Sequence, residues 1–168
     1  MSEEWWDLYD KDGVSLDIKI KRGHPLDTTQ YHKVLHNWIF NEHGEFLVQK
    51  RAPHLKWCPD MWATTTGSII SGSTDEKIEA YRELKEELGL DDSHIDLEFL
   101  EKIILGQSIV YIFSGFMPKH ISKHIALNDE VTEYGWMKFS KIMELRKQQL
   151  FAHYSDELIH IVSKIKPF

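Results

Sequence analysis

The chain has 168 residues, 42% of them hydrophobic and 12% aromatic, and this length and composition predict one compact domain spanning residues 1–168. Its single cysteine, Cys58, excludes a disulfide scaffold. The formal net charge of −7 argues against sequence-independent binding to a phosphate backbone, so no nucleic-acid polymer is expected as a partner. Because no apolar run is long enough for a membrane span and residues 1–4 do not resemble a signal peptide, we expect a soluble cytoplasmic protein without a membrane partner.

Strand patterns dominate the chain. The predicted strands, in chain order, are Trp5–Tyr9, Ser15–Lys21, His32–Phe40, residues 46–50, 63–70, 97–105, 109–116 and 131–137. The turn at residues 41–45 predicts that the third and fourth of these strands form a hairpin. One central helix is predicted at residues 73–90, and two more at residues 139–149 and 156–164. This order predicts an α/β domain with a mixed sheet.

The central helix has the clearest boundaries. Ser73 and Glu76 fit a capping box, which predicts Ser73 as the N-cap, and Gly89 stands where a helix normally ends. Apolar residues recur every three or four positions and predict one buried stripe: Ile78, Tyr81, Leu84 and Leu88.

Glutamates occupy the predicted surface of this helix: Glu79, Glu83, Glu86 and Glu87. Carboxylates three and four residues apart repel each other on a helix, and a bound hard cation would turn that repulsion into ligation. Oxygen ligands without His or Cys favour Mg²⁺ or Mn²⁺ over zinc. The spacing alone is equally compatible with a solvated acidic helix face.

The segment from Arg82 to Leu90 resembles the second half of the Nudix box, because it matches Arg-Glu-U-x-Glu-Glu-x-Gly-U, where U is aliphatic, at every specified position. The first half matches less well. Ser68 stands where the box has its glycine, although Gly67 keeps a glycine beside it, and Thr74 replaces the glutamate of the loop. Both departures put the details of that loop in question.

Segments outside the box, such as Trp6-Asp7-Leu8-Tyr9 and Pro59-Asp60-Met61-Trp62, resemble the Nudix branch that is related to isopentenyl-diphosphate isomerase. The resemblance implies the Nudix α/β/α sandwich, with a mixed sheet and a loop-helix-loop metal site. It also implies a MutT-like pyrophosphatase that uses Mg²⁺ or Mn²⁺ to hydrolyse the diphosphate bond of a small-molecule nucleoside diphosphate derivative.

By the same resemblance, the metal ligands are three carboxylates and one backbone carbonyl: Glu83, Glu86, Glu87 and Gly67. Arg82 is expected to form an ion pair with Glu83 that keeps this carboxylate ionised. The attacking water would be deprotonated by either Glu83 or Glu130. For Glu130, the role of an ordinary acidic residue on the surface is equally compatible with the sequence.

Lys50 and Arg51 are candidates to contact substrate phosphate, although basic residues at a strand end are more often merely exposed. The loops at residues 22–30 and 119–128 are candidates to select the substrate, and no sequence pattern in them indicates which substrate that is. Trp57 and Tyr31 are candidate base-stacking residues, with core packing as the alternative. A homodimer is possible, and the sequence does not decide it.

Two alternatives remain beside the hydrolase. Isomerase chemistry would need a cysteine just ahead of the box, but residues 63–68 contain none, and Cys58 is expected to be a buried structural residue. His32 resembles an isomerase metal ligand, but a hydrogen-bonded core histidine is the more common role. The other alternative is a nucleotide-binding Nudix module with weak catalysis, against which the intact Arg82–Glu87 segment argues.

Overall fold

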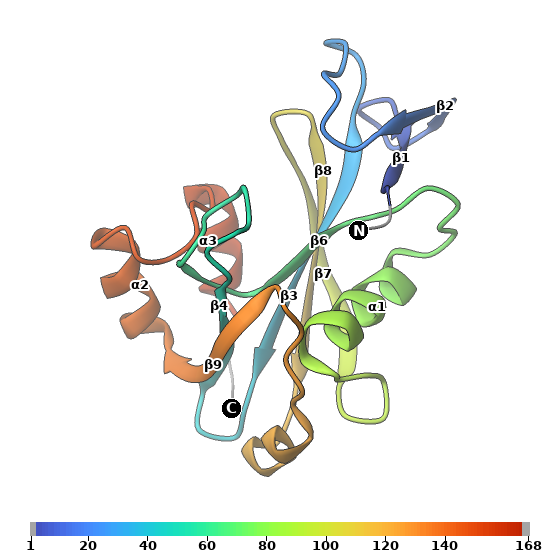
Figure 1. Cartoon of the computed structure of the whole chain (residues 1–168). Helices are drawn as coiled ribbons and strands as arrows, with labels where there is room; N and C mark the ends of the chain where they lie inside the picture. Colours follow the sequence, from blue (N-terminus) through green and yellow to red (C-terminus); the bar gives the residue numbers. More distant parts are fainter. Residues whose placement is uncertain (1–2, 166–168) are drawn as a thin grey trace.

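The computed structural model of the chain describes residues 3–165 (Figure 1). Its strands are β1 (Trp5–Tyr9), β2 (Ser15–Lys21), β3 (His32–Phe40), β4 (Glu45–Arg51), β5 (Trp62–Ala63), β6 (Thr65–Ser68), β7 (Asp96–Leu105), β8 (Ser108–Phe116) and β9 (Val131–Lys138). Its helices are α1 (Glu76–Leu88), α2 (Phe139–Lys147), α3 (Asp156–Val162) and the 3₁₀ helix η1 (Lys119–His124). In the described part of the chain, no helix is both long and apolar enough to cross a membrane.

The larger sheet is mixed. Strand β3 runs parallel to β8 and antiparallel to β6, and β7 pairs antiparallel with the other side of β8. The predicted hairpin of β3 and β4 forms only at its turn, where Phe40 pairs with Phe46. Beyond that pair, β4 instead hydrogen-bonds to β5 and β9, and β3 hydrogen-bonds to β6. The hairpin prediction was therefore right about the turn and wrong about continuous pairing, because other strands occupy the facing edges.

Helices cover both faces of this sheet. Helix α1 lies on one side in Figure 1, while α2 and α3 lie on the other. Two apolar cores match these two layers: one includes Leu84 and Leu88 of α1, and the other includes Ile142 of α2 and Leu158 of α3. The predicted α/β/α sandwich with a mixed sheet is confirmed.

Helix α1 begins later than predicted. Asp75, not Ser73, is its N-cap, because the Asp75 carboxylate accepts a hydrogen bond of 3.0 Å from the Ile78 backbone N–H. Thr74 therefore lies just before the cap. At the other end, Gly89 adopts φ 69°, a left-handed conformation that glycine accommodates without strain, as the sequence predicted.

The buried face of α1 is also rotated from the predicted stripe. Ile78 is 64% exposed, whereas Ala80 and Leu84 are fully buried. Glu79 and Glu87, predicted on the surface, are buried as well. Simple apolar periodicity failed here because two carboxylates occupy positions on the face that packs against the sheet.

A separate two-stranded sheet, β1–β2, packs against the loop that leads into α1. The Asp7 carboxylate accepts hydrogen bonds from the Ser71 hydroxyl (2.7 Å) and the Gly72 backbone N–H (2.8 Å). The Ser71 backbone N–H donates in turn to the Trp5 carbonyl (2.7 Å). These contacts fix the N-terminal hairpin relative to the start of α1.

We expect His36 to make the fold sensitive to acid. This side chain in β3 is buried edge-on to Tyr154, and burial lowers its pKa to about 3. The folded protein keeps His36 neutral, whereas the unfolded chain takes up a proton below pH 6.5, so stability should fall as the pH drops from 6.5 toward 3. Between pH 7.5 and pH 5.0, His36 alone should remove about 2 kcal/mol from the free energy of unfolding.

Chemical denaturation of wild type and His36→Phe at these two pH values isolates this contribution, because other titrating groups are common to both proteins. The wild type should lose about 2 kcal/mol more than the variant on acidification. Equal losses in the two proteins would assign the acid sensitivity to other groups.

Candidate active site

The guanidinium of Arg82 joins three carboxylates on one side of α1. It lies 2.9 Å from Glu79, 2.6 Å from Glu83 and 2.8 Å from Glu86. Burial of the guanidinium disfavours its charge, but Glu83, Glu86 and Glu79 together raise its pKa. The ion pair predicted between Arg82 and Glu83 is present, and Arg82 also makes two ion pairs that were not predicted. Glu79 is one of these missed partners, and its spacing of three residues from Arg82 was the available signal.

Burial changes the charge state of the two inner glutamates. The pKa of Glu83 is raised to about 7 by burial, although Arg82 opposes this shift. The pKa of Glu87 is raised to about 8, first by burial and then by the nearby charge of Glu83. The expectation that Arg82 keeps Glu83 fully ionised is therefore wrong for the protein alone, because loss of hydration outweighs the attraction of the guanidinium.

Gly67 lies directly beneath the Glu83 side chain. A Cβ atom at this position would come within 2.1 Å of the Glu83 carboxyl carbon, so only glycine leaves room for the carboxylate. Ser68 is the next residue of β6, and strand alternation directs its side chain to the opposite face. The departure from the box at Ser68 therefore leaves the space around Glu83 open.

Glu87 has a partner that the sequence did not reveal. The Gln49 side-chain amide on β4 donates a hydrogen bond to the Glu87 carboxylate, and Thr65 donates to the Gln49 carbonyl oxygen at 3.1 Å. Both Gln49 and Thr65 are buried. No local pattern indicates this chain of contacts, because it joins three segments that only the folded sheet brings together.

Arg51 and Glu130 also lie near Glu87. The Arg51 charge lowers the pKa of Glu87, whereas the Glu130 charge raises it. The Glu130 carbonyl accepts a hydrogen bond of 2.8 Å from the Ala52 backbone N–H, which fixes the Glu130 segment at the end of β4. The Arg51 guanidinium donates to the Trp57 carbonyl at 2.8 Å and lies 5.0 Å from the centre of the Trp57 ring.

Lys50 does not join Arg51 and Glu130 beside Glu87. Its ammonium lies 3.5 Å from Glu133, its cross-strand neighbour on β9. Because successive strand residues face opposite sides of a sheet, Lys50 points away from the face to which Gln49 contributes.

The donor set fits a hard divalent cation in its chemistry. Glu83, Glu86 and Glu87 offer carboxylate oxygens. The Glu86 charge raises the pKa of Glu83, and the Glu83 charge raises that of Glu87, a repulsion that a cation would offset. Within residues 3–165, no three His, Cys, Asp or Glu side chains are gathered closely enough to enclose an ion. Arg82 supplies the positive charge instead, so ligation by all three glutamates requires Glu83 and Glu86 to turn away from it.

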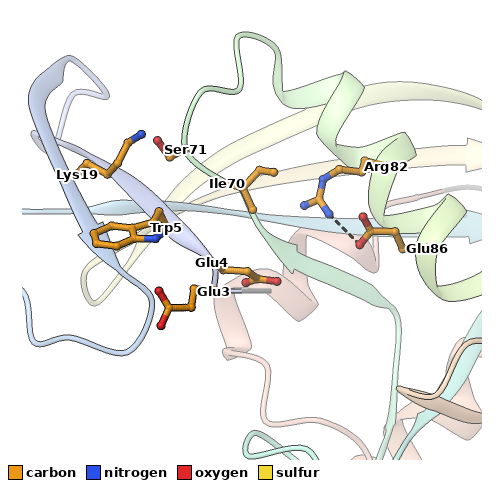
Figure 2. Close-up of a pocket in the computed structure, with 8 residues that line it drawn as sticks. All are labelled: Glu3, Glu4, Trp5, Lys19, Ile70, Ser71, Arg82 and Glu86. Carbon is orange, nitrogen blue, oxygen red and sulfur yellow. Dashed lines mark hydrogen bonds and ion pairs between the residues drawn. The ribbon is translucent and has the colours of Figure 1, made fainter. Parts of the chain in front are cut away.

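An open cavity of about 530 Å³ is lined by Glu86, one of these three carboxylates, and by Arg82. Figure 2 shows Arg82 and Glu86 of α1 on one side of it, Ile70 near the middle, and Trp5 with Lys19 on the other side. Glu3 and Glu4 also line it, and the Glu4 charge raises the pKa of Glu83. Sequence analysis missed the residues of this wall, and the adjacent pair Trp5-Trp6 was the one available signal.

Cys58 and His32, the two residues considered for isomerase chemistry, both make contacts of a structural kind. Cys58 is a buried free thiol within the core that packs against α2 and α3, as the sequence predicted. His32 stacks on Trp6, with ring centres 3.9 Å apart, and its Nε2 lies 2.9 Å from the Ser108 hydroxyl. Burial lowers the pKa of His32 to about 4, so it is neutral at pH 7.

Comparisons with known proteins agree with this architecture. An uncharacterized Nudix hydrolase of Listeria monocytogenes is 36% identical over 88 residues, 52% of each chain, so the match spans about half the length of this relative. An isopentenyl-diphosphate Delta-isomerase of Klebsiella pneumoniae is 28% identical over 126 residues, 71% of this chain and 67% of the relative. The crystal structure of DR0079 from Deinococcus radiodurans shares the fold, with a TM-score of 0.78 at 15% identity, over 97% of this chain and 100% of that one.

The family model described as the NUDIX domain matches residues 30–158. The matched region contains the whole of α1, with Arg82, Glu83, Glu86 and Glu87, and the strands that carry Gln49 and Gly67. The chain therefore belongs to the Nudix family.

Proposed function

We propose that the protein is a hydrolase that uses Mg²⁺ or Mn²⁺ to cleave the diphosphate bond of a small-molecule nucleoside diphosphate derivative. The observation that carries this proposal is the carboxylate group of α1. Glu87 is buried, the Glu83 side chain is only 12% exposed, and the Glu83 charge acts on Glu87. Glu86 of the same helix lines an open cavity, and all three lie within the region that matches the NUDIX domain. Buried carboxylates with raised pKa values are typical of sites that act on protons or cations.

The proposed roles follow from position. Glu83, Glu86 and Glu87, with the Gly67 carbonyl, would hold the cation, which would supply positive charge to the diphosphate oxygens. When Glu83 and Glu86 turn from Arg82 to the cation, Arg82 would keep its ion pair with Glu79 and remain beside the site as a positive charge. Glu83 or Glu130 would accept the proton of the attacking water.

Of the two basic candidates for phosphate binding, Arg51 is favoured, because its charge acts on Glu87 whereas Lys50 is paired with Glu133. A homodimer remains compatible with these roles, and none of them requires it.

A hydrolysis screen tests the proposal. Nucleoside diphosphates, dinucleoside polyphosphates, nucleotide sugars and prenyl diphosphates should be incubated with Mg²⁺, with Mn²⁺ and with EDTA, using wild type and the double variant Glu86→Gln/Glu87→Gln. We expect wild type to cleave at least one of these compounds only when the cation is present, and the double variant to cleave none. By calorimetry, the double variant should have lost its affinity for the metal. Unchanged metal binding in that variant would refute the ligand assignment, and turnover in EDTA would refute the metal dependence.

Isomerase activity is the second candidate, because of the similarity to the Klebsiella enzyme over 71% of the chain. We predict that Cys58 takes no part in turnover, because its thiol is buried in the core packed against α2 and α3. Cys58→Ala should cost roughly 1 kcal/mol of stability through the small cavity it leaves, with turnover per folded molecule unchanged. A folded Cys58→Ala variant that had lost turnover would favour cysteine-dependent isomerisation.

A further inference from the structure

The two adjacent tryptophans of β1 have different surroundings. The Trp6 ring is stacked on His32 at an angle of 7° between the ring planes, so it has a structural partner. Trp5 is 42% exposed and lines the cavity next to α1. Strand alternation explains the difference, because neighbouring side chains of β1 point to opposite faces. An exposed indole in a cavity presents a flat apolar surface that the core does not use.

Trp5 lies across the cavity from the residues proposed to hold the diphosphate. Figure 2 shows its ring on the side opposite Arg82 and Glu86. A substrate with its diphosphate at α1 would therefore place the attached group along the cavity toward the indole. The hairpin that carries Trp5 lies outside residues 30–158, the part that matches the NUDIX domain.

The position of Trp5 relative to α1 is fixed by hydrogen bonds. The Trp5 carbonyl accepts from the Ser71 backbone N–H, and Asp7, two residues along the same strand, accepts from Ser71 and Gly72. Ser71 and Gly72 belong to the loop that leads into the helix. The backbone that carries the indole is thus held at the far end of the cavity by the same loop that precedes the carboxylates.

Most of the other residues that line the cavity are charged, and Ile70 and Ser71 are the exceptions. Glu3 and Glu4 line it beside Trp5, and they are paired with Lys21, the last residue of β2, and with Arg22, which follows it. The Lys19 side chain also lines it. An apolar prenyl chain in this space would remove water from these charges without replacing its hydrogen bonds. A nucleoside presents a flat base to the indole and hydroxyl or amino donors to the carboxylates.

We infer that Trp5 is a specificity-determining residue whose indole face stacks on the base of a nucleoside diphosphate derivative. The inference rests on the proposed function for the location of the diphosphate. Stacking of a base on an aromatic side chain is worth enough to change affinity roughly tenfold or more.

The test measures binding and turnover separately. Binding of the α,β-methylene analogues of ADP, GDP, CDP and UDP, in which carbon replaces the bridging oxygen, is measured by calorimetry with Mg²⁺. Methylenediphosphonate, which has no ring, is the reference ligand. The variants are Trp5→Ala, Trp5→Phe and, as a matched control, Ile18→Ala, because Ile18 is on the same hairpin, is also 42% exposed and does not line the cavity.

We expect Trp5→Ala to weaken binding of at least one nucleoside analogue roughly tenfold while leaving methylenediphosphonate unchanged. Trp5→Phe should restore most of the affinity, and Ile18→Ala should match wild type. With a hydrolysed nucleotide, Trp5→Ala should raise KM far more than it lowers kcat. Equal binding by Trp5→Ala and wild type, or an equal loss for methylenediphosphonate, would overturn the inference.

Failure of the proposed function gives a different result. A wild type that binds a nucleoside analogue through Trp5 but cleaves none of the screened diphosphates would refute the hydrolase and support the stacking role. Cleavage that is indifferent to Trp5 would leave the hydrolase standing and refute the stacking role.

Discussion

Glu83→Gln is expected to lower turnover by a factor of about 10² to 10⁴, the usual contribution of a general base. An amide cannot accept the proton of the attacking water, and it is a poorer ligand for a hard cation than a carboxylate. The loss is expected whether Glu83 acts as base, as metal ligand or as both. Turnover per folded molecule with saturating Mg²⁺ measures it.

The same substitution should change stability little without metal. The neutral amide would no longer attract the Arg82 guanidinium as a carboxylate does, but Arg82 keeps Glu79 and Glu86 as partners. The loss of one charge also relieves repulsion with Glu86 and Glu87. We therefore expect a change within about 1 kcal/mol, because the loss and the gain act in opposite directions.

Glu76→Gln provides the matched control. Glu76 is on the same helix and forms a comparable ion pair, with Lys33 at 2.7 Å, but it is not among the proposed ligands. This variant should lose some stability and keep its turnover. If Glu83→Gln melted much earlier than wild type but turned over normally per folded molecule, the acidic face would be structural and the proposed mechanism would fail.

Local patterns in the sequence predicted most of the elements. Alternation predicted Ser15–Lys21 as a strand with its observed limits, and Gly89 correctly marked the end of α1. These features depend on neighbouring residues alone. The Nudix resemblance predicted the α/β/α sandwich, because the motif is tied to one fold.

The errors concern contacts between distant segments. The pairing of β4 with β9 replaces the expected hairpin, and it joins residues more than 80 positions apart, such as Lys50 and Glu133. The burial of Glu79 and Glu87 depends on Arg82 and Gln49 as partners, which hydrophobic periodicity does not register. Trp5 likewise became a candidate only when folding placed it across a cavity from Arg82.

Gly67→Ala is expected to abolish most activity at a modest cost in stability. The new methyl group would lie 2.1 Å from the Glu83 carboxyl carbon and 2.4 Å from its Oε1, so the carboxylate must leave its position. The backbone of β6 is extended at this residue, so alanine itself is well tolerated there. We expect a stability loss of about 1 to 3 kcal/mol from overpacking and a fall in kcat/KM of at least about 10²-fold.

Two other strand glycines separate the effect on the site from the effect on packing. At Gly135 in β9, a Cβ would approach Trp62 no closer than 3.8 Å, so Gly135→Ala should leave both stability and activity near wild type. At Gly115 in β8, a Cβ would lie 2.7 Å from Ile95, so Gly115→Ala should be destabilising with unchanged turnover per folded molecule. Denaturant unfolding and turnover with saturating Mg²⁺ are measured on all three variants.

The comparison of Gly67→Ala with Gly115→Ala is decisive, because both introduce an overpacked methyl group and only one of them displaces Glu83. If activity per folded molecule fell equally in the two variants, general strain would explain the loss. If Gly67→Ala kept full activity, the Glu83 carboxylate could work from a displaced position, and the site built around Gly67 and Glu83 would be wrong. A selective loss in Gly67→Ala would mean that the position of this one carboxylate limits the reaction.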